Sequence, residues 1–153
     1  MQIKRVTETD FPKLKTLFCE YYRELDCEDD PEEIFDGVVS DDLKSGLISA
    51  AAAFDGNALV GFVIYQIDDV INDWCFKDGS GDIRELFVTP SSRKSGIGSA
   101  LVAFAESQLK AEGAAEVYLL PTEQSEKFFI KLGYADDGEY CAELDNKVFA
   151  KIV

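Results

Sequence analysis

The spacing of apolar residues changes along the chain between a helical and a strand period, and these changes predict the order of the elements. A short strand over 2–6 is followed by capping side chains at 7–10 and by Pro12 in a first helical turn. That helix is predicted to end near Leu25, because apolar residues recur on one face at helical spacing: Phe11, Leu14, Phe18, Tyr21 and Leu25. A weaker helical pattern covers 31–43.

From Ser49 onward the pattern favours strands. Small, β-branched and aromatic residues over 49–54 and 58–67 predict a β-hairpin around Asp55-Gly56-Asn57, with Asp-Gly as a favoured turn pair. A polar and irregular stretch over 68–81 leads to a strand over 82–88, which Pro90 ends because it cannot continue a ladder.

The last third of the chain alternates between helical and strand patterns. The predicted elements are a helix from Ile97 to the C-cap Gly113, a strand over 115–120, a helix over 123–132 capped by Thr122 and stopped by Gly133, and strands over 134–141 and 144–153. The helix from Ile97 is expected to bury Ile97, Leu101, Phe104, Ala105 and Leu109. Because no repeat or linker interrupts this order, we expect a single mixed α/β domain over 1–153.

Composition narrows the chemistry that this fold can carry. The 153 residues include 15 Lys and Arg against 30 Asp and Glu, so the formal charge is −15, and histidine is absent. Such a chain lacks the basic face that a nucleic-acid binder needs. It also lacks the commonest general base and zinc ligand, which leaves carboxylates, Tyr, Cys, Lys and the backbone for catalysis.

The cysteines and the apolar stretches favour an ordinary intracellular protein. The four cysteines are scattered without a CxxC pair, so we expect reduced thiols and no metal site: Cys19, Cys27, Cys75 and Cys141. No apolar stretch is long enough for a membrane span, and the first residues lack the apolar core of a targeting peptide. The expectation is a cytoplasmic protein without a membrane partner.

The most informative stretch is a strand-to-helix turn that runs from Val88 to Ser99. Glycines at 96 and 98 let a ligand approach the backbone, and the free N–H groups of a helix start attract an anion. Arg93 and Lys94 add two cations there. The alternative is a plain turn in which the glycines serve tight packing. A Walker loop is excluded because the chain has no GxxxxGK[ST], and a dinucleotide site lacks its third glycine.

Two segments resemble the Gcn5-related N-acetyltransferase (GNAT) family. Val88-Thr89-Pro90, Arg93 to Gly98 and Leu101 are similar to its pattern V-x-P…[RQ]-x-x-G-x-[GA]-x-x-L, and residues 128–134 resemble its F-Y-x-K-x-G-F segment. The resemblance covers the whole chain. It implies a central, mostly antiparallel sheet of about seven strands flanked by about four helices, and acetyl-CoA as the acetyl donor without a metal.

The resemblance also implies the donor site. Backbone N–H groups of 93–99 would cradle the pyrophosphate, and the strand backbone at 86–88 would pair with the pantetheine arm. Thr122 and Phe129 stand where relatives place an Asn that contacts CoA and a catalytic Tyr. The donor-binding candidates are therefore Leu86, Phe87, Val88, Arg93, Lys94, Ser95, Gly96, Ile97, Gly98, Ser99, Thr122 and Phe129.

Acetyl transfer needs a neutral amine, and a base on the strand over 82–88 can remove the proton that a primary amine carries at pH 7. Alternation places Asp82, Arg84 and Leu86 on one face, and Ile83, Glu85 and Phe87 on the other. The resemblance implies that a base on this strand stands at the position of Asp82 or at that of Arg84, and an arginine cannot serve as a base. Asp82 is therefore the first candidate base and Glu85 the second. The alternative is that both are ordinary strand charges, one of them paired with Arg84.

The acid that protonates the departing thiolate is also open, because the family Tyr is Phe129 here. Tyr134, Tyr140 or water can replace it, the thiolate can leave unassisted, or activity can be lost. Tyr134 is the candidate acid that we carry forward.

The resemblance implies that the segment between the first two helices lines the acceptor side, and the charge of that segment predicts the kind of acceptor. Residues 24–33 hold seven carboxylates and no cation, which is either a solvated acidic loop or a field that attracts a cationic amine. Tyr21 or Tyr22 could add an aromatic face for an ammonium group. We therefore expect a cationic small-molecule or peptide amine as the partner.

Two functions remain open from the sequence. The first is transfer of the acetyl group from acetyl-CoA directly to a primary amine. The second is a non-catalytic acyl-CoA-binding sensor or regulatory module, which the missing Tyr and His would suit. A homodimer formed through exposed strands is left open.

Overall fold

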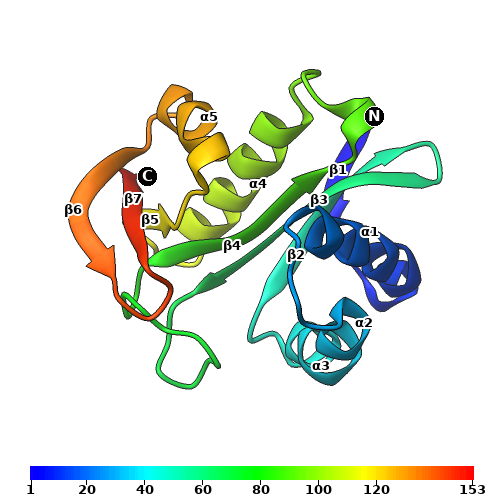
Figure 1. Ribbon diagram of the computed structural model, residues 1–153, viewed down its shortest axis with the longest axis horizontal. Coiled ribbons are helices and arrows are strands. Elements are labelled where there is room, and N and C mark those ends of the chain that lie inside the picture. Colours follow the sequence, from blue (N-terminus) through cyan, green and yellow to red (C-terminus); the bar gives the residue numbers. More distant parts are fainter. The chain divides into compact units, whose positions relative to one another are not determined.

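The computed structural model describes residues 1–153, and its strands and helices follow the predicted order (Figure 1). The strands are β1 Gln2–Arg5, β2 Ser49–Asp55, β3 Ala58–Ile67, β4 Gly81–Val88, β5 Glu116–Leu119, β6 Ala135–Cys141 and β7 Asn146–Ile152. The helices are α1 Phe11–Glu24, α2 Pro31–Ile34, α3 Ser40–Ser45, α4 Ile97–Ala111 and α5 Glu126–Lys131.

Seven strands form one sheet in the order β1-β2-β3-β4-β5-β7-β6. The pairs β1–β2, β5–β7 and β6–β7 are antiparallel, and β4–β5 is parallel. The mixed α/β class and the seven strands confirm the prediction. The parallel pair is short, because β4 pairs with β5 only at Gly81 and Asp82 although β4 continues to Val88.

The chain forms two compact units, which we describe separately. The first contains Met1–Ile64 and Glu85–Ala105, and the second contains Tyr65–Arg84 and Glu106–Val153. The single domain expected over 1–153 stays a prediction.

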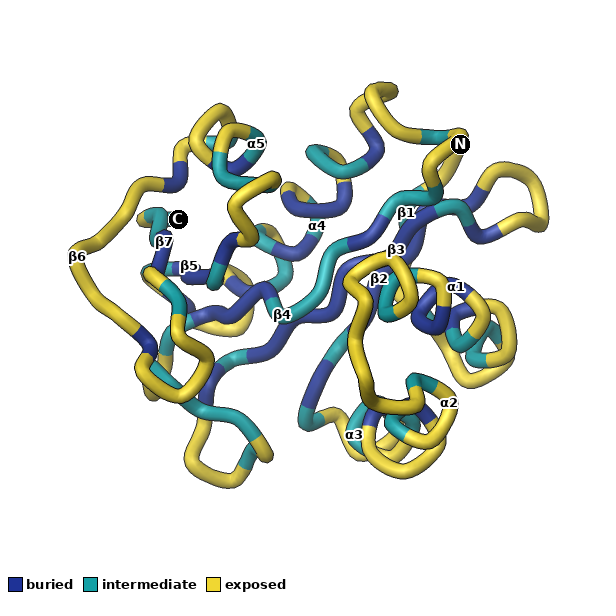
Figure 2. Tube along the Cα trace, in the orientation of Figure 1, coloured by how far each residue is buried: buried dark blue, intermediate teal, exposed yellow.

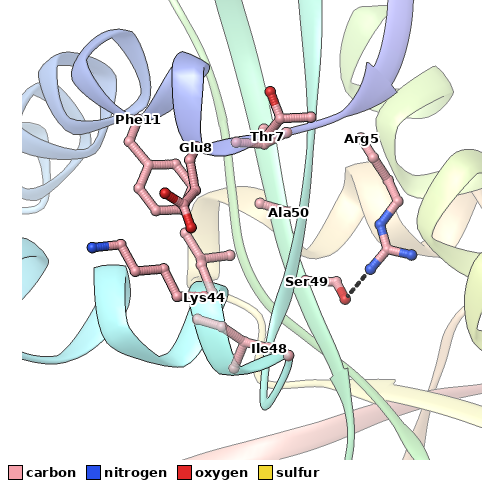
Figure 3. Close-up of a pocket in the computed structure, with 11 residues that line it drawn as sticks. Arg5, Thr7, Glu8, Phe11, Lys44, Ile48, Ser49 and Ala50 are labelled. Atoms are coloured by element: carbon pink, nitrogen blue, oxygen red, sulfur yellow. Dashed lines mark hydrogen bonds between the residues drawn. The ribbon is translucent and has the colours of Figure 1, made fainter.

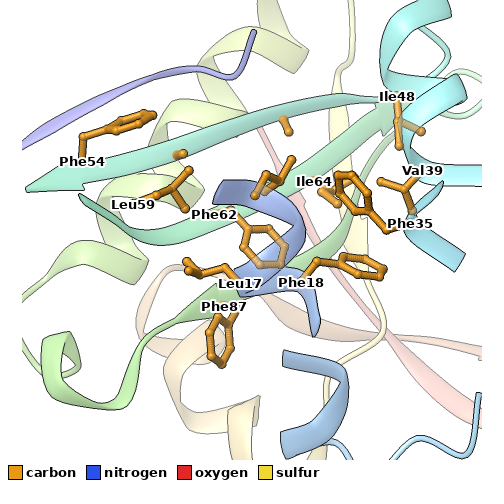
Figure 4. Packing of buried hydrophobic residues seen from close by; sticks show 13 residues of the cluster. Leu17, Phe18, Phe35, Val39, Ile48, Phe54, Leu59, Phe62, Ile64 and Phe87 are labelled. Atoms are coloured by element: carbon orange, nitrogen blue, oxygen red, sulfur yellow. The ribbon is translucent and has the colours of Figure 1, made fainter. Parts of the chain in front are cut away.

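An aromatic core holds the first unit together (Figure 4). Phe18 of α1 packs against Phe62 of β3 at 6.4 Å between ring centroids, and Phe62 lies 6.1 Å from Phe87 of β4. The side chains at 50–53 of β2 are alanines and are all buried, as the buried middle of that strand shows in Figure 2. Small residues on one strand and large rings on the facing elements together make up this core.

The second unit has a smaller core around Tyr118, Cys141 and Val148, with Trp74 and Phe76 packed against it. Phe76 lies 5.7 Å from the Tyr118 ring. The segment 68–80 between β3 and β4 therefore carries part of this core, although it forms no regular element.

Three predicted details differ from the structure. The hairpin turn is the pair Gly56-Asn57, with φ +62° at Gly56, because Asp55 still belongs to β2. The helix expected over 31–43 is helical to Ser45 but contains a π-helical turn at Phe35–Val39, which joins α2 to α3. Phe104 is only half-buried, whereas Val102 is buried.

Candidate active site

The turn before α4 has the backbone shape of an anion cradle. Lys94 has φ +60° and Gly96 φ +86°, so the chain turns twice through the left-handed region before the helix begins. A Cβ added at Gly96 would meet no protein atom within 4 Å. Glycine at 96 therefore serves backbone conformation and open space rather than packing inside the protein.

The N–H groups of this turn have no protein acceptor. Ala100 is the first residue to donate, to the Gly96 carbonyl at 3.0 Å, and no backbone N–H from 94 to 99 makes a hydrogen bond within the protein. Unpaired donors at the positive end of a fifteen-residue helix favour a negatively charged group. The cradle thus fits the pyrophosphate that the resemblance places there. We refer to residues 94–99 as the donor loop.

The side chains around the donor loop are largely engaged. Arg93 donates from Nε to the Val88 carbonyl at 2.9 Å, and its Nη2 lies 2.6 and 2.8 Å from the carboxylate oxygens of Glu24. Ser95 donates to the Ser92 carbonyl, and Ile97 is buried where α4 begins. Lys94, in contrast, is exposed and makes no ion pair.

The end of β4 faces two environments. Phe87 is buried 5.6 Å from the Tyr21 ring of α1, and Leu86 and Val88 are half-buried. Since β4 leaves β5 after Asp82, the backbone of 83–88 continues as a strand beyond its last β5 pair.

The two candidate bases differ in exposure. Asp82 is 2% exposed and lies opposite Tyr118 in the β4–β5 register. Burial raises the pKa of the Tyr118 hydroxyl, and the Asp82 charge and a hydrogen bond to Asp68 raise it further. Glu85 is half-buried beside Tyr21. Burial raises the pKa of Tyr21, and the charge of Glu85 and a hydrogen bond to it raise it further.

The candidate acid is held by another carboxylate. Tyr134 is buried, with 2% of its surface exposed, and its hydroxyl donates a hydrogen bond to Glu106 Oε1 at 2.9 Å. Glu106 also forms an ion pair with Lys151 at 3.0 Å. Burial raises the Tyr134 pKa, and the Glu106 charge adds to this. Phe129 is buried 5.7 Å from the Tyr134 ring, so the family hydroxyl is replaced by an aromatic contact. Tyr140 lies exposed on β6.

Thr122 acts as a helix cap. Its hydroxyl accepts a hydrogen bond from the Ser125 N–H at 3.2 Å, as the sequence predicted. The neighbouring carbonyl of Pro121 accepts from Asn146 of β7 at 2.9 Å.

Sequence reasoning missed a buried polar network around Asp68, which is 1% exposed. The Asp68 carboxylate accepts from Gln66 at 2.8 Å, from the Tyr118 hydroxyl at 2.6 Å and from the N–H groups of Phe76 and Lys77. Gln66 in turn accepts from Arg84 at 2.9 Å, so the cation in the family's base position has an amide partner. Polar residues at the end of an apolar strand were the only available signal.

A pocket of about 220 Å³ opens elsewhere in the first unit (Figure 3). Its lining comes from β1, the start of α1, the end of α3 and β2, and it includes Arg5, Glu8 and Lys44. Arg5 donates to Ser49, another lining residue, at 2.9 Å. None of the predicted donor or catalytic residues lines this pocket.

The acidic segment 24–33 is exposed almost throughout, and only Pro31 is half-buried. The two tyrosines before it belong to the aromatic core. Tyr22 stacks on Phe18 at 4.4 Å, and Tyr21 lies 6.0 Å from Phe62.

A comparison with known protein families tests the resemblance to the N-acetyltransferases. Residues 11–134 match the acetyltransferase (GNAT) family. The chain belongs to this family. The expected enzyme class, an acetyl-CoA-dependent N-acetyltransferase, is thereby confirmed.

Individual relatives of this GNAT protein include aminoglycoside-modifying enzymes. The aminoglycoside N(6′)-acetyltransferase type 1 of Klebsiella aerogenes is 27% identical over 114 residues, 74% of this chain and 74% of that protein. The PaiA N-acetyltransferase of Thermoplasma acidophilum, solved with coenzyme A, superposes with a TM-score of 0.73 at 19% identity and covers 99% of this chain and 98% of its own. The aminoglycoside 6′-N-acetyltransferase of Enterococcus faecium gives 0.73 at 22% identity, with 99% and 97% covered. Both structures share the fold of this acetyltransferase.

Two further observations concern metal binding and membrane spans. No group of three or more Cys, Asp or Glu side chains is arranged to hold a metal ion. No helix has the length and apolar character that crossing a membrane requires.

Proposed function

We propose that this GNAT protein transfers the acetyl group of acetyl-CoA directly to the primary amine of a small cationic molecule. The observation that carries the donor side is the row of N–H groups over 94–99 without a protein acceptor. The donor is a polyphosphate, and in a chain of charge −15 this loop combines free N–H groups at a helix start with the adjacent cations Arg93 and Lys94, which together favour an anion. The coenzyme A held by the Thermoplasma relative supports this assignment.

The chemistry that the protein must supply is deprotonation of an ammonium group. A primary amine is mostly protonated at pH 7, and a carboxylate close to it can take the proton directly or through water. Exposure favours Glu85, because a base must reach its substrate and Asp82 is 2% exposed. We propose Glu85 as the base and Asp82 as the alternative.

The leaving thiolate has no assigned acid in this proposal. The Tyr134 hydroxyl donates a hydrogen bond to Glu106, and Phe129 has no hydroxyl. Water is therefore the proton source that we propose for the departing thiol.

Charge supports a cationic acceptor. The acidic segment 24–33 begins at the last residue of α1 and is exposed almost throughout, so its field extends into solvent. The Klebsiella relative is named for an aminoglycoside, which is a polyamine. The cytoplasmic location and the homodimer stay predictions.

The deciding experiment measures release of free thiol from acetyl-CoA with a panel of amines. The panel contains an aminoglycoside, spermidine, a lysine peptide and acidic amino acids, and we expect turnover with the cationic members. In a calorimetric measurement of CoA binding, Gly96→Ala should weaken binding at least tenfold, because its Cβ enters the space for the pyrophosphate. Gly113→Ala is the control, since Gly113 also has positive φ and open space around its Cβ. Equal CoA affinity in both variants would contradict the loop assignment.

The Tyr134 hydroxyl is bonded to Glu106 and Phe129 has no hydroxyl, so neither side chain is free to protonate the thiolate. This observation favours the second candidate function, an acyl-CoA-binding regulatory module. The same panel separates the two. Tight CoA binding without amine-dependent thiol release from any acceptor would favour the module.

A further inference from the structure

The last residue of α1 is tied to the residue that precedes the donor loop. Glu24 and Arg93 are 69 positions apart, and Arg93 Nη2 lies 2.6 and 2.8 Å from the two carboxylate oxygens of Glu24. Both side chains are partly exposed, at 40% for Arg93 and 47% for Glu24. The pair therefore forms in water, at the surface of the first unit.

Two other contacts hold the Arg93 guanidinium at the start of the donor loop. Nε donates to the carbonyl of Val88, the last residue of β4, and the guanidinium lies 5.5 Å from the centre of the Phe87 ring. These contacts hold the cation near the end of β4, and Arg93 directly precedes the unpaired N–H groups of 94–99, so the positive charge and the free donors are adjacent in the chain and make up one electropositive segment. Glu24 neutralises the part of that region contributed by Arg93.

We propose that Glu24 is the resident counterion of Arg93 and that the phosphates of the acetyl donor displace it. An exposed ion pair contributes little stability, whereas a phosphate carries at least as much charge as a carboxylate and can accept two hydrogen bonds from one guanidinium. Glu24 therefore lowers donor affinity in the free enzyme. After the exchange its charge is released to the acidic segment 24–33, of which it is the first residue.

This inference rests on the donor loop of the proposed function. The exchange links the two sides of the reaction, because the donor frees a carboxylate on the side that we assign to the acceptor. Because such coupling is reciprocal, a cationic acceptor that draws Glu24 away from Arg93 should strengthen donor binding by the same factor by which the bound donor strengthens acceptor binding.

Calorimetric measurement of CoA binding to the 153-residue protein tests the exchange. Glu24→Gln should bind CoA about two- to fivefold more tightly, the range expected for an exposed ion pair. Glu20→Gln is the matched control, because Glu20 is exposed on α1 one turn earlier and makes no ion pair with Arg93. It removes the same charge and should give less than half of that gain.

Two further arms make the result specific. In an Arg93→Gln background, Glu24→Gln should no longer improve CoA binding, and pantetheine, which has no phosphate, should bind equally to the wild type and Glu24→Gln. Unchanged or weaker CoA binding by Glu24→Gln, or a gain that persists without Arg93, would overturn the inference. Urea unfolding confirms that each variant is folded. If Gly96→Ala weakens CoA binding and Glu24→Gln does not tighten it, only this inference fails.

Discussion

Glu85 shows how one residue acquires a role from its neighbours. The sequence places Glu85 on the strand over 82–88, and the structure adds a hydrogen bond from the Tyr21 hydroxyl to its carboxylate. Burial raises the pKa of Tyr21, so its hydroxyl stays protonated and can donate that bond. A half-buried carboxylate with a fixed hydroxyl beside it is oriented and still reachable. Asp82 lies on the same strand, but it is buried and lies opposite Tyr118 of β5.

This difference predicts distinct pH profiles for the two carboxylates. Glu85→Gln should lower kcat/KM about 10²- to 10⁴-fold near pH 7, the usual contribution of a general base. The loss should shrink as the pH approaches the pKa of the free amine, because the substrate then deprotonates itself. Stopped assays of thiol release between pH 6.5 and 10 measure this. Asp82→Asn should chiefly lower the free energy of unfolding, and the reverse pattern would make Asp82 the base.

At the scale of elements, the segment 68–80 is ordered by buried polar contacts instead of by a helix or strand. Asp68 holds its start, and Lys77 binds three carboxylates, at 2.8 Å from Glu116, 2.8 Å from Asp137 and 3.2 Å from Glu139. These carboxylates lie on β5 and β6. Lys77 therefore joins an irregular segment to two strands, which a local sequence pattern cannot reveal.

Replacing Lys77 by Met should lower the free energy of unfolding by about 2–3 kcal/mol at pH 7, because three carboxylates lose their shared cation. Burial lowers the pKa of Lys77, but its hydrogen bonds to Asp137, Glu116 and Glu139 outweigh this, so the folded pKa is raised above 10.5. A raised pKa gives a contribution that is complete below pH 10.5 and is lost as the pH rises through the folded value.

Urea unfolding of the wild type and Lys77→Met at several pH values checks this. The difference should be constant from pH 7 to 9.5 and should decrease above pH 10.5. Lys15→Met is the control, since it breaks one exposed pair with Asp36 and should change the free energy of unfolding much less than Lys77→Met does. A difference that disappears already at pH 9 would contradict the assignment.

For the whole molecule, the charge of −15 sets the long-range field, and the donor loop is a local exception to it. The excess carboxylates attract cations from beyond contact distance, but salt screens this attraction within about 10 Å at 0.1 M. The field therefore affects encounter with the acceptor more than the chemical step.

We expect KM for a multiply charged amine such as spermidine to rise several-fold between about 0.02 and 0.5 M NaCl, while kcat changes little. A monoamine acceptor should show a smaller increase, because fewer charges are screened. Initial rates at saturating acetyl-CoA measure both. A KM that is independent of salt for both amines would show that the acidic surface does not select the acceptor.

The sequence by itself determined the order of helices and strands, because the period of apolar residues is a local property, and it determined the family, because a glycine turn before a helix is local too. The cap at Thr122 was predictable for the same reason. Only the tertiary structure decided that Glu24 neutralises Arg93, that Glu106 holds Tyr134 and that Asp68 binds Tyr118. These partners are 69, 28 and 50 residues apart, and their encounter depends on how the elements pack, which no local pattern records.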